Sequence, residues 1–176
     1  EMVKKLVPGA KCKWAYGWKV FDYVHGDDTK VMAWKQRMQE RMREAGIEEM
    51  GRVGHEEIAK LYQKATVLLY PTEFYEIDCI SVRKAQAAGC YPVTTDFAAL
   101  DTTNQLGFKA HSDKDSANWC GPGQMDFSLT DKEKISQMAE EAARRLLLKH
   151  VPMDDKWALQ FDWSVIAQKW DDTLGV

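Results

Sequence analysis

Residues 66–95 read TVLLYPTEFYEIDCISVRKAQAAGCYPVTT, and they predict a strand, a helix and a second strand in succession. Thr66–Tyr70 is a continuous apolar run before a proline, which is typical of a strand buried on both faces of a parallel sheet. Ile80–Ala88 is a short, alanine-rich helix that ends at Gly89, and Tyr91–Thr94 is the next β-rich run. This order predicts two parallel strands joined by a crossover helix.

The alternation of strands and helices continues on both sides of this stretch. Upstream we expect a strand at Cys12–Tyr16, a loop at Gly17–Thr29, a helix from Val31 to Ala45, a strand at Met50–Val53, and a helix carrying Ile58, Leu61, Tyr62 and Ala65. Downstream we expect loop over Asp96–Gly123 with a short strand near Phe108–Ala110, a helix opened by the capping box Thr130-x-x-Glu133, and a terminal amphipathic helix capped by Asp162. The pattern predicts an α/β fold with an open parallel sheet and helices on both faces. We expect residues 1–176 to form a single domain, with its C-terminal helix at 161–176.

The composition is that of a globular protein and argues against several classes of function. Of the 176 residues, 45% are hydrophobic and 29% are charged, which suits a domain with its own core. The net charge is −3 and no basic stripe stands out, so we expect no nucleic-acid partner. Apolar runs such as Val67–Tyr70 are far shorter than the roughly 20 residues of a membrane helix, so we expect no transmembrane segment.

The cysteines predict neither a disulfide framework nor a zinc site. No C-x-x-C pair occurs among Cys12, Cys79, Cys90 and Cys120, and the four histidines supply no ligand spacing. Reduced cysteines are typical of the cytoplasm, where we expect the protein to be located. The acidic pairs at residues 27–28, 154–155 and 171–172 do not follow β-rich runs, so we expect no bound metal.

The loop after the third expected strand has the richest chemistry. Ligands of open parallel sheets bind beyond the carboxyl ends of the strands, and Thr72–Asp78 leads from such an end into a helix. The backbone N–H groups around Asp78–Ser81 would suit a phosphate. Glu76 and Asp78 allow two interpretations: they complement the dipole at the helix start, or they accept hydrogen bonds from the hydroxyls of a sugar phosphate.

Four further side chains allow both a functional and a structural interpretation. Trp14 and Trp18 either stack on a base or sugar ring or belong to the core, and the core is the commoner place for such aromatics. His55 either orients a ligand oxygen or bonds to backbone at a helix start. Cys79 stands where a thiol pKa tends to fall, but no partnered base is indicated, so we expect it to pack.

Two neighbouring motifs are specific enough to suggest a family. Tyr70-Pro71-Thr72-x-x-x-Glu76 precedes Ala85-Gln86-Ala87-Ala88-Gly89-Cys90-Tyr91-Pro92-Val93-Thr94-Thr95. Together they resemble the donor-binding motif of group 1 (family 4) glycosyltransferases, which have the GT-B fold. The family pattern is Pro-Ser/Thr, a Glu, seven residues, a second Glu, Ala, a variable residue, and Ala-x-Gly-x-Pro-Val-Val. The stretch 51–65 also resembles the family's preceding loop and helix, and residues 163–170 resemble its C-terminal helix.

The resemblance implies a Rossmann-like, nucleotide-sugar-binding domain, the C-terminal half of a GT-B fold. Glu76 falls on the Glu that contacts the hydroxyls of the transferred sugar, and we take it as the catalytic position. Ile77, Asp78 and Cys79 fall on residues whose backbone N–H groups face the donor diphosphate, although Asp78-Cys79 replaces a frequent Phe-Gly.

Lys84 is the main departure from the family pattern. The family's second Glu at this position accepts hydrogen bonds from the ribose hydroxyls, whereas lysine has only donors. Lys84 would instead meet a phosphate or pair with a carboxylate, and this leaves the identity of the donor open. Gly54 and His55 fall in the loop that lies near the nucleotide base in the family.

The resemblance also implies parts of the protein that this chain lacks. In the family an Arg and a Lys after the first strand of this domain hold the diphosphate, and a separate N-terminal domain binds the acceptor. Met2–Val7 resembles the end of a first helix before Pro8-Gly9, so we expect a fragment without those two cations. A pyrophosphate leaving group needs such charge, so we expect the isolated chain to be weak or inert as a catalyst.

Three functions follow from these observations. The leading hypothesis is the donor-binding domain of a retaining glycosyltransferase, which transfers a hexosyl unit from a nucleoside diphosphate sugar to a hydroxyl of an unknown glycan or lipid acceptor. We expect neither a cofactor nor a metal between the donor phosphates. The alternatives are a non-catalytic module that binds sugar nucleotides or glycans, and an enzyme similar to nucleotide-sugar 2-epimerases.

Overall fold

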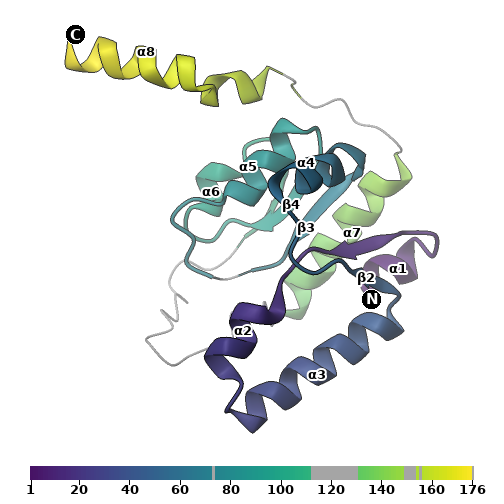
Figure 1. Cartoon of the computed structure of the whole chain (residues 1–176). Helices are drawn as coiled ribbons and strands as arrows, with labels where there is room; N and C mark the ends of the chain where they lie inside the picture. The colour runs from purple at the N-terminus through teal and green to yellow at the C-terminus, as the bar shows by residue number, and fades with distance from the viewer. Residues whose placement is uncertain (73, 112–130, 149–153, 155, 176) are drawn as a thin grey trace. The chain divides into compact units, whose positions relative to one another are not determined.

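The computed structural model describes residues 1–72, 74–111, 131–148, 154 and 156–175. The chain divides into two compact units, Glu1–Leu61 and Tyr62–Val176. Each contains parallel strands flanked by helices, and the elements are labelled in Figure 1. The predicted α/β class with parallel strands is confirmed, and the strands form two separate ladders.

The first unit contains a two-stranded parallel ladder. β1 (Cys12–Trp14) pairs with β2 (Ile47–Glu49), with Cys12 opposite Ile47. Asp28 begins α3, because its carboxylate accepts hydrogen bonds from the amides of Lys30 and Val31. The helices of this unit are α1 (Met2–Leu6), α2 (Trp18–His25), α3 (Thr29–Glu44) and the first part of α4 (His55–Lys64).

The position of β2 corrects the expectation of a strand at Met50–Val53. The strand lies three residues earlier because Gly46, with φ +63°, turns the chain directly out of α3 and into β2. Gly51, with φ +68°, then interrupts the extended backbone within the expected stretch. Two left-handed glycines therefore set both ends of this strand.

The segment expected as a loop at Gly17–Thr29 contains α2. Its Trp18 ring packs edge-on against Tyr16 and Phe21, with centroids 5.0 and 5.4 Å apart. Phe21 in turn lies 5.9 Å from Trp34 of α3. Ring packing of this kind stabilises a helix whose intrinsic propensity is modest. Trp14 extends the row at 6.2 Å from Tyr16 but is exposed, so the core interpretation is wrong for Trp14, whereas Trp18 is half-buried among these rings.

The second unit contains the strand–helix–strand stretch predicted from residues 66–95. β3 (Val67–Tyr70), β4 (Tyr91–Thr95) and β5 (Phe108–Ala110) form one parallel sheet in that order. The helices of this unit are α5 (Ile80–Ala87), the unexpected α6 (Leu100–Thr103), α7 (Lys132–Leu147), the 3-10 helix η2 (Trp157–Phe161) and α8 (Trp163–Leu174).

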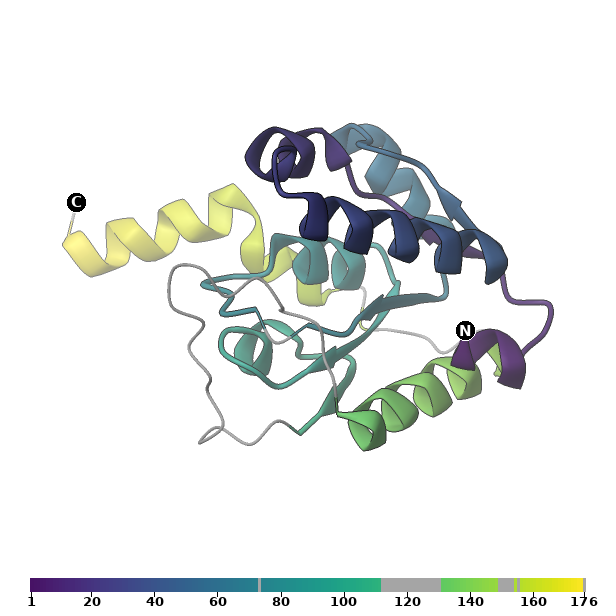
Figure 2. The same ribbon diagram turned by 90° about the horizontal axis from the view of Figure 1, so that it is seen from below.

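Helices cover both faces of the three-stranded sheet, as predicted (Figure 2). Leu68 and Tyr70 of β3 pack against a buried cluster of Cys79, Val82 and Leu100, on the side of α5. Leu68 pairs with Pro92, so its neighbour Tyr91 points to the other face. There the Arg145 guanidinium of α7 lies over the Tyr91 ring, 3.7 Å from its centroid. α5 and α7 therefore lie on opposite faces.

Two buried amide side chains hold the connection between β4 and β5. Gln86 of α5 donates to the Thr103 carbonyl at 2.8 Å, and its Oε1 accepts from the amides of Gln105 and Leu106. Asn104 donates to the Thr94 hydroxyl at 2.8 Å and to the Phe108 carbonyl at 2.9 Å. Side chains that satisfy several buried backbone groups are costly to replace.

Gly107 lies in the tightest part of this connection. A Cβ at this position would stand 2.0 Å from the Pro92 carbonyl oxygen and 2.7 Å from Oδ1 of Asn104. The Asn104 oxygen already accepts the Gly107 amide hydrogen at 2.9 Å. Only glycine therefore fits between β4 and the start of β5.

The two long C-terminal helices begin at aspartates. Asp131 begins α7, since its carboxylate accepts from the amides of Glu133 and Lys134; the expected cap, Thr130, lies outside the described residues. Asp162 begins α8 as predicted and accepts from the Ser164 amide at 2.8 Å. α8 has no buried residue, and its large apolar side chains, Trp163, Trp170 and Leu174, are exposed.

The Gln86 hydrogen bonds give a stability prediction. Gln86→Leu keeps the volume but leaves the Thr103 carbonyl and two backbone amides without their buried partner, so we expect a loss of about 3 kcal/mol or more in unfolding free energy. Urea denaturation followed by circular dichroism measures it. Gln63→Leu, at an exposed position of α4, is the control and should change stability by less than about 0.5 kcal/mol. Equal stability of the two variants would contradict the structural role of Gln86.

Candidate functional site

β3, β4 and β5 end at one edge of their sheet because all three run in the same direction. Their register places Tyr70 beside Thr94, and Thr95 beside Ala110. The residues beyond these ends are held to one another: the Thr95 hydroxyl donates to the Thr72 carbonyl at 2.7 Å, and the Asp96 amide donates to the Ala110 carbonyl at 3.0 Å. We define the carboxyl-edge site as Tyr70, Thr72, Glu76, Asp96 and His111.

Glu76, the predicted catalytic residue, is half-buried in this site. The Tyr70 hydroxyl, at the end of β3, donates to its Oε1 at 2.6 Å. Among the described residues nothing donates to Oε2. Burial, reinforced by the hydrogen bond to Glu76, raises the pKa of Tyr70 far above its usual value, so the phenol keeps its proton.

The loops that follow β3 and β4 pack against each other around Glu76. The Ala99 amide donates to the Glu76 carbonyl at 3.3 Å, and the Tyr75 and Phe97 rings meet edge-on with centroids 5.7 Å apart. Ala98, between these contacts, has φ 51° in the left-handed region. Contacts from both loops therefore fix the backbone of Glu76.

Ile77 and Asp78, predicted to face a diphosphate through their backbone, differ in what their side chains do. Ile77 is 93% exposed, so no described residue of this unit covers it. The Asp78 carboxylate is engaged, because Arg83 Nε lies 2.7 and 3.0 Å from its two oxygens and the Thr103 hydroxyl donates to it at 3.2 Å. The negative charge at the start of α5 is therefore largely neutralised within the protein.

Cys79 occupies the N-cap position of α5, and its side chain is only 4% exposed. Burial raises the pKa of its thiol, and the backbone N–H groups of Val82 and Ser81 oppose the rise without reversing it. Cys79 therefore packs as a neutral thiol in the cluster with Val82 and Leu100, in agreement with the structural interpretation.

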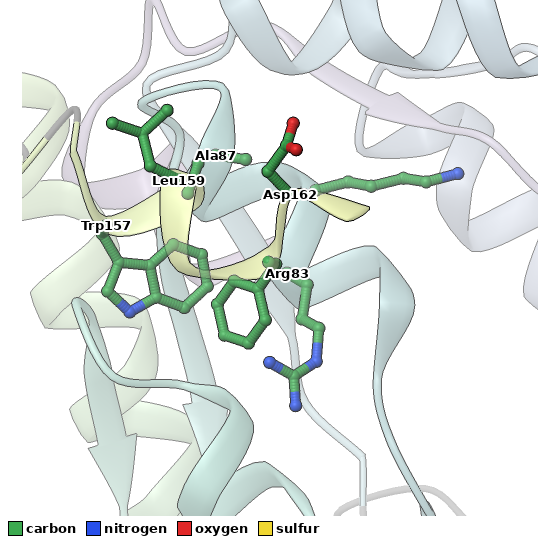
Figure 3. A pocket seen from close by; sticks show the side chains of 8 residues that line it. Arg83, Ala87, Trp157, Leu159 and Asp162 are labelled. Atoms are coloured by element: carbon green, nitrogen blue, oxygen red, sulfur yellow. The ribbon is translucent and has the colours of Figure 1, made fainter. Parts of the chain in front are cut away.

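Lys84 lines a pocket of about 420 Å³ between α5 and η2, shown from close by in Figure 3. Arg83, Ala87 and Lys84 come from α5, and Trp157, Ala158, Leu159, Phe161 and Asp162 come from η2 and its end. The lining includes none of the residues of the carboxyl-edge site, so the structure does not bring Lys84 and Glu76 into one pocket. Lys84, at the family's second Glu position, therefore lies in a different environment from Glu76, at the first.

η2 is fixed by two interactions across this pocket region. The Trp157 indole donates to Gln105 Oε1 at 2.7 Å, and the Arg83 guanidinium lies 4.5 Å from the centroid of the Phe161 ring. Arg83 therefore links Asp78 at the start of α5 to η2. The pocket walls are mostly apolar, with the cationic side chains of Arg83 and Lys84 at their border.

Gly54 and His55, predicted near the nucleotide base, belong to the first unit. Gly54 is exposed, and its carbonyl accepts the Ile58 amide hydrogen at the start of α4. His55 is the first residue of α4 and is also exposed. The carboxyl-edge site is described from Tyr62–Val176 alone.

The structure adds a pair that the sequence analysis did not single out. His111 Nδ1 lies 2.7 Å from Asp96 Oδ2, and the carboxylate is well buried, with 13% of its side chain exposed against 75% for the histidine. Both residues directly follow strands, so the rule that ligands bind beyond the carboxyl ends of strands was the signal that could have found them.

The described residues contain neither a candidate metal site nor a membrane-spanning helix. No group of three or more His, Cys, Asp or Glu side chains there is arranged to hold a metal ion. None of the described helices is both long enough and apolar enough to cross a membrane.

The chain was also compared with known proteins. It matches neither a model of a known protein family nor a curated protein sequence.

The burial of Cys79 gives a reactivity prediction. In folded protein at pH 8, iodoacetamide should modify the partly exposed Cys12 at least tenfold faster than Cys79 or Cys90, because burial raises both thiol pKa values, that of Cys90 to about 12. Peptide mass spectrometry at increasing times measures the three rates. In denaturant the three rates should converge; rapid modification of Cys79 in the folded chain would mean an exposed, activated thiol.

Proposed function

We propose that this chain is the nucleotide-sugar-binding domain of a retaining glycosyltransferase of the GT-B type. The parent protein would transfer a hexosyl unit from a nucleoside diphosphate sugar to a hydroxyl of a glycan or lipid, bound by a domain outside this chain. One observation carries the proposal: Glu76 is held half-buried by Tyr70 beyond the carboxyl end of β3, at the position where the resemblance requires an acceptor for sugar hydroxyls.

The hydrogen bond from Tyr70 supports this role because it orients the carboxylate. An ionised carboxylate only accepts hydrogen bonds, and Tyr70 occupies one of the two oxygens of Glu76. No described residue donates to the other oxygen, which can therefore accept from a ligand, and sugar hydroxyls are such donors. A side chain held by a half-buried phenol at a strand end is also pre-organised, so little entropy is lost when the ligand binds.

The start of α5 supports the binding of the diphosphate. Backbone N–H groups at a helix N-terminus favour an anion, whereas two bare carboxylates beside them would repel it. Arg83 neutralises Asp78, so that repulsion is reduced at the residues that the resemblance assigns to the diphosphate. Asp78 then serves to hold Arg83 and Thr103, while its backbone remains the part proposed to approach the ligand.

Lys84 favours a second candidate, a module that binds sugar nucleotides or glycans without catalysis. The pocket that Lys84 lines combines aromatic side chains of η2 with this lysine, although Arg83 in its lining is paired with Asp78 and the Asp162 carboxylate also lines it. An aromatic wall beside a lysine suits a ligand that has both a planar ring and a negative charge. Such a pocket does not replace the ribose contact of the family's second Glu in kind.

A cytoplasmic location agrees with either candidate. Cys12, Cys79 and Cys90 are free thiols, and reducing conditions keep thiols in that state.

Calorimetric titration with uridine and guanosine diphosphates and their hexose derivatives tests the proposal. We expect Glu76→Gln to weaken the sugar-bearing nucleotide about tenfold or more and the bare diphosphate little, because the variant loses a charged hydrogen bond to the sugar alone. Glu140→Gln is the matched control, since Glu140 of α7 also accepts from a hydroxyl, that of Ser136 at 2.9 Å. Equal weakening of both ligands would contradict the role of Glu76, and no binding of any of them at millimolar concentration would overturn the proposal.

The same titration tests whether Lys84 belongs to the nucleotide site. If Lys84 meets the diphosphate, Lys84→Ala should weaken bare and sugar-bearing nucleotides equally, by about tenfold, through the loss of a charged hydrogen bond. Lys132→Ala, at an exposed position at the start of α7, is the control. Unchanged affinity for both ligands would exclude Lys84 from the nucleotide site.

A further inference from the structure

The pair of Asp96 and His111 joins a mostly buried carboxylate to an exposed imidazole at the carboxyl-edge site. Their backbones are fixed by the parallel ladder, since Thr95 pairs with Ala110 and the Asp96 amide donates to the Ala110 carbonyl. The end of β4 is in turn held by the buried hydrogen bond between Asn104 and Thr94. The ring of His111 therefore projects from a rigid base.

The carboxylate determines which nitrogen of the His111 ring carries the proton. An ionised carboxylate can only accept, so Nδ1 must donate to Asp96 across the 2.7 Å contact. In the neutral ring this leaves Nε2 as a hydrogen-bond acceptor. A buried carboxylate that orients an imidazole in this way presents one well-defined acceptor atom to whatever binds at the edge.

Asp96 and Glu76 belong to the same face of the sheet edge. The hydrogen bond from the Asp96 amide to the Ala110 carbonyl continues the ladder one residue past the end of β4, so strand alternation assigns Asp96 to the face of Thr94. Thr94 pairs with Tyr70, which holds Glu76. The face thus carries two acceptors, the second oxygen of Glu76 and Nε2 of His111. The nearby cation of β5, Lys109, is engaged by the Asp101 carboxylate at 3.1 Å.

We infer that His111, oriented by Asp96, binds a hydroxyl of the sugar part of the donor beside Glu76. The inference deepens the proposed function and rests on it. A neutral ring joined to an ionised carboxylate carries a net negative charge, which disfavours a phosphate and suits the hydroxyls of a sugar. The substrate class assigned to this end of the site is therefore a polyhydroxylated ring, with the diphosphate directed to the start of α5.

Variants of both residues test the inference by calorimetry with the ligands used for Glu76. His111→Gln should weaken the hexose-bearing nucleotide about three- to tenfold and leave the bare diphosphate unchanged. Asp96→Asn should do the same, because an amide donates to Nδ1 and so moves the proton to Nε2. His25→Gln, in α2 of the first unit, is the control and should leave both affinities unchanged. Thermal melting establishes that each variant is folded.

Nuclear magnetic resonance of the His111 ring nitrogens distinguishes a ligand-binding role from a purely structural one. If the pair with Asp96 is only structural, adding the ligand should leave these resonances unchanged. The free protein should show the tautomer with the proton on Nδ1. Binding of the hexose-bearing nucleotide should shift the Nε2 resonance of the ring and leave the proton on Nδ1, because a sugar hydroxyl then donates to Nε2.

The outcomes separate this inference from the proposed function. Unchanged affinity of His111→Gln with a wild-type chain that binds, or an Nε2 resonance that binding does not shift, overturns the role of His111 and leaves the donor-binding function in place. Failure of the wild-type chain to bind any of the nucleotides removes both.

Discussion

Parallel pairing of β4 with both β3 and β5 is the constraint on which the candidate site depends. Because the three strands run in one direction, the residues beyond Tyr70, Thr95 and Ala110 are delivered to a single edge. The Thr95 hydroxyl then joins the end of β4 to the residues after β3, and the Asp96 amide joins it to the end of β5. The chemistry of the site therefore follows from sheet topology first and from side-chain identity second.

The three carboxylates near this edge have different hydrogen-bond partners and therefore different properties. Glu76 is held by a phenol, Asp78 by a guanidinium and Asp96 by an imidazole. A phenol leaves a carboxylate charged and able to accept from a ligand, whereas a guanidinium offsets the charge. Three carboxylates within one group of loops thus differ in what they offer a ligand, because their partners differ.

The sequence predicted the second unit better than the first, for reasons that lie in the range of the interactions. In residues 66–95 the strand, helix and turn signals are local, since a proline and a glycine separate two β-rich runs from an alanine-rich helix. α2 depends on contact with Trp34, and the place of β2 depends on left-handed glycines that pattern alone did not reveal. The candidate site divides in the same way. The motif pointed to Glu76, but the bond from Tyr70, the Arg83–Asp78 pair and the Asp96–His111 pair are contacts that no sequence spacing specifies.

The absence of space at Gly107 has a consequence for interpreting natural variation in this protein. A methyl group there would collide with backbone, which cannot rotate away as a side chain can, so the two strands would have to separate. A screen for loss of function would then score this glycine as essential although it lies outside the carboxyl-edge site. Loss of function in variants of Gly107 would therefore reflect the close approach of Gly107 to β4. It should not be taken as evidence that Gly107 binds a ligand.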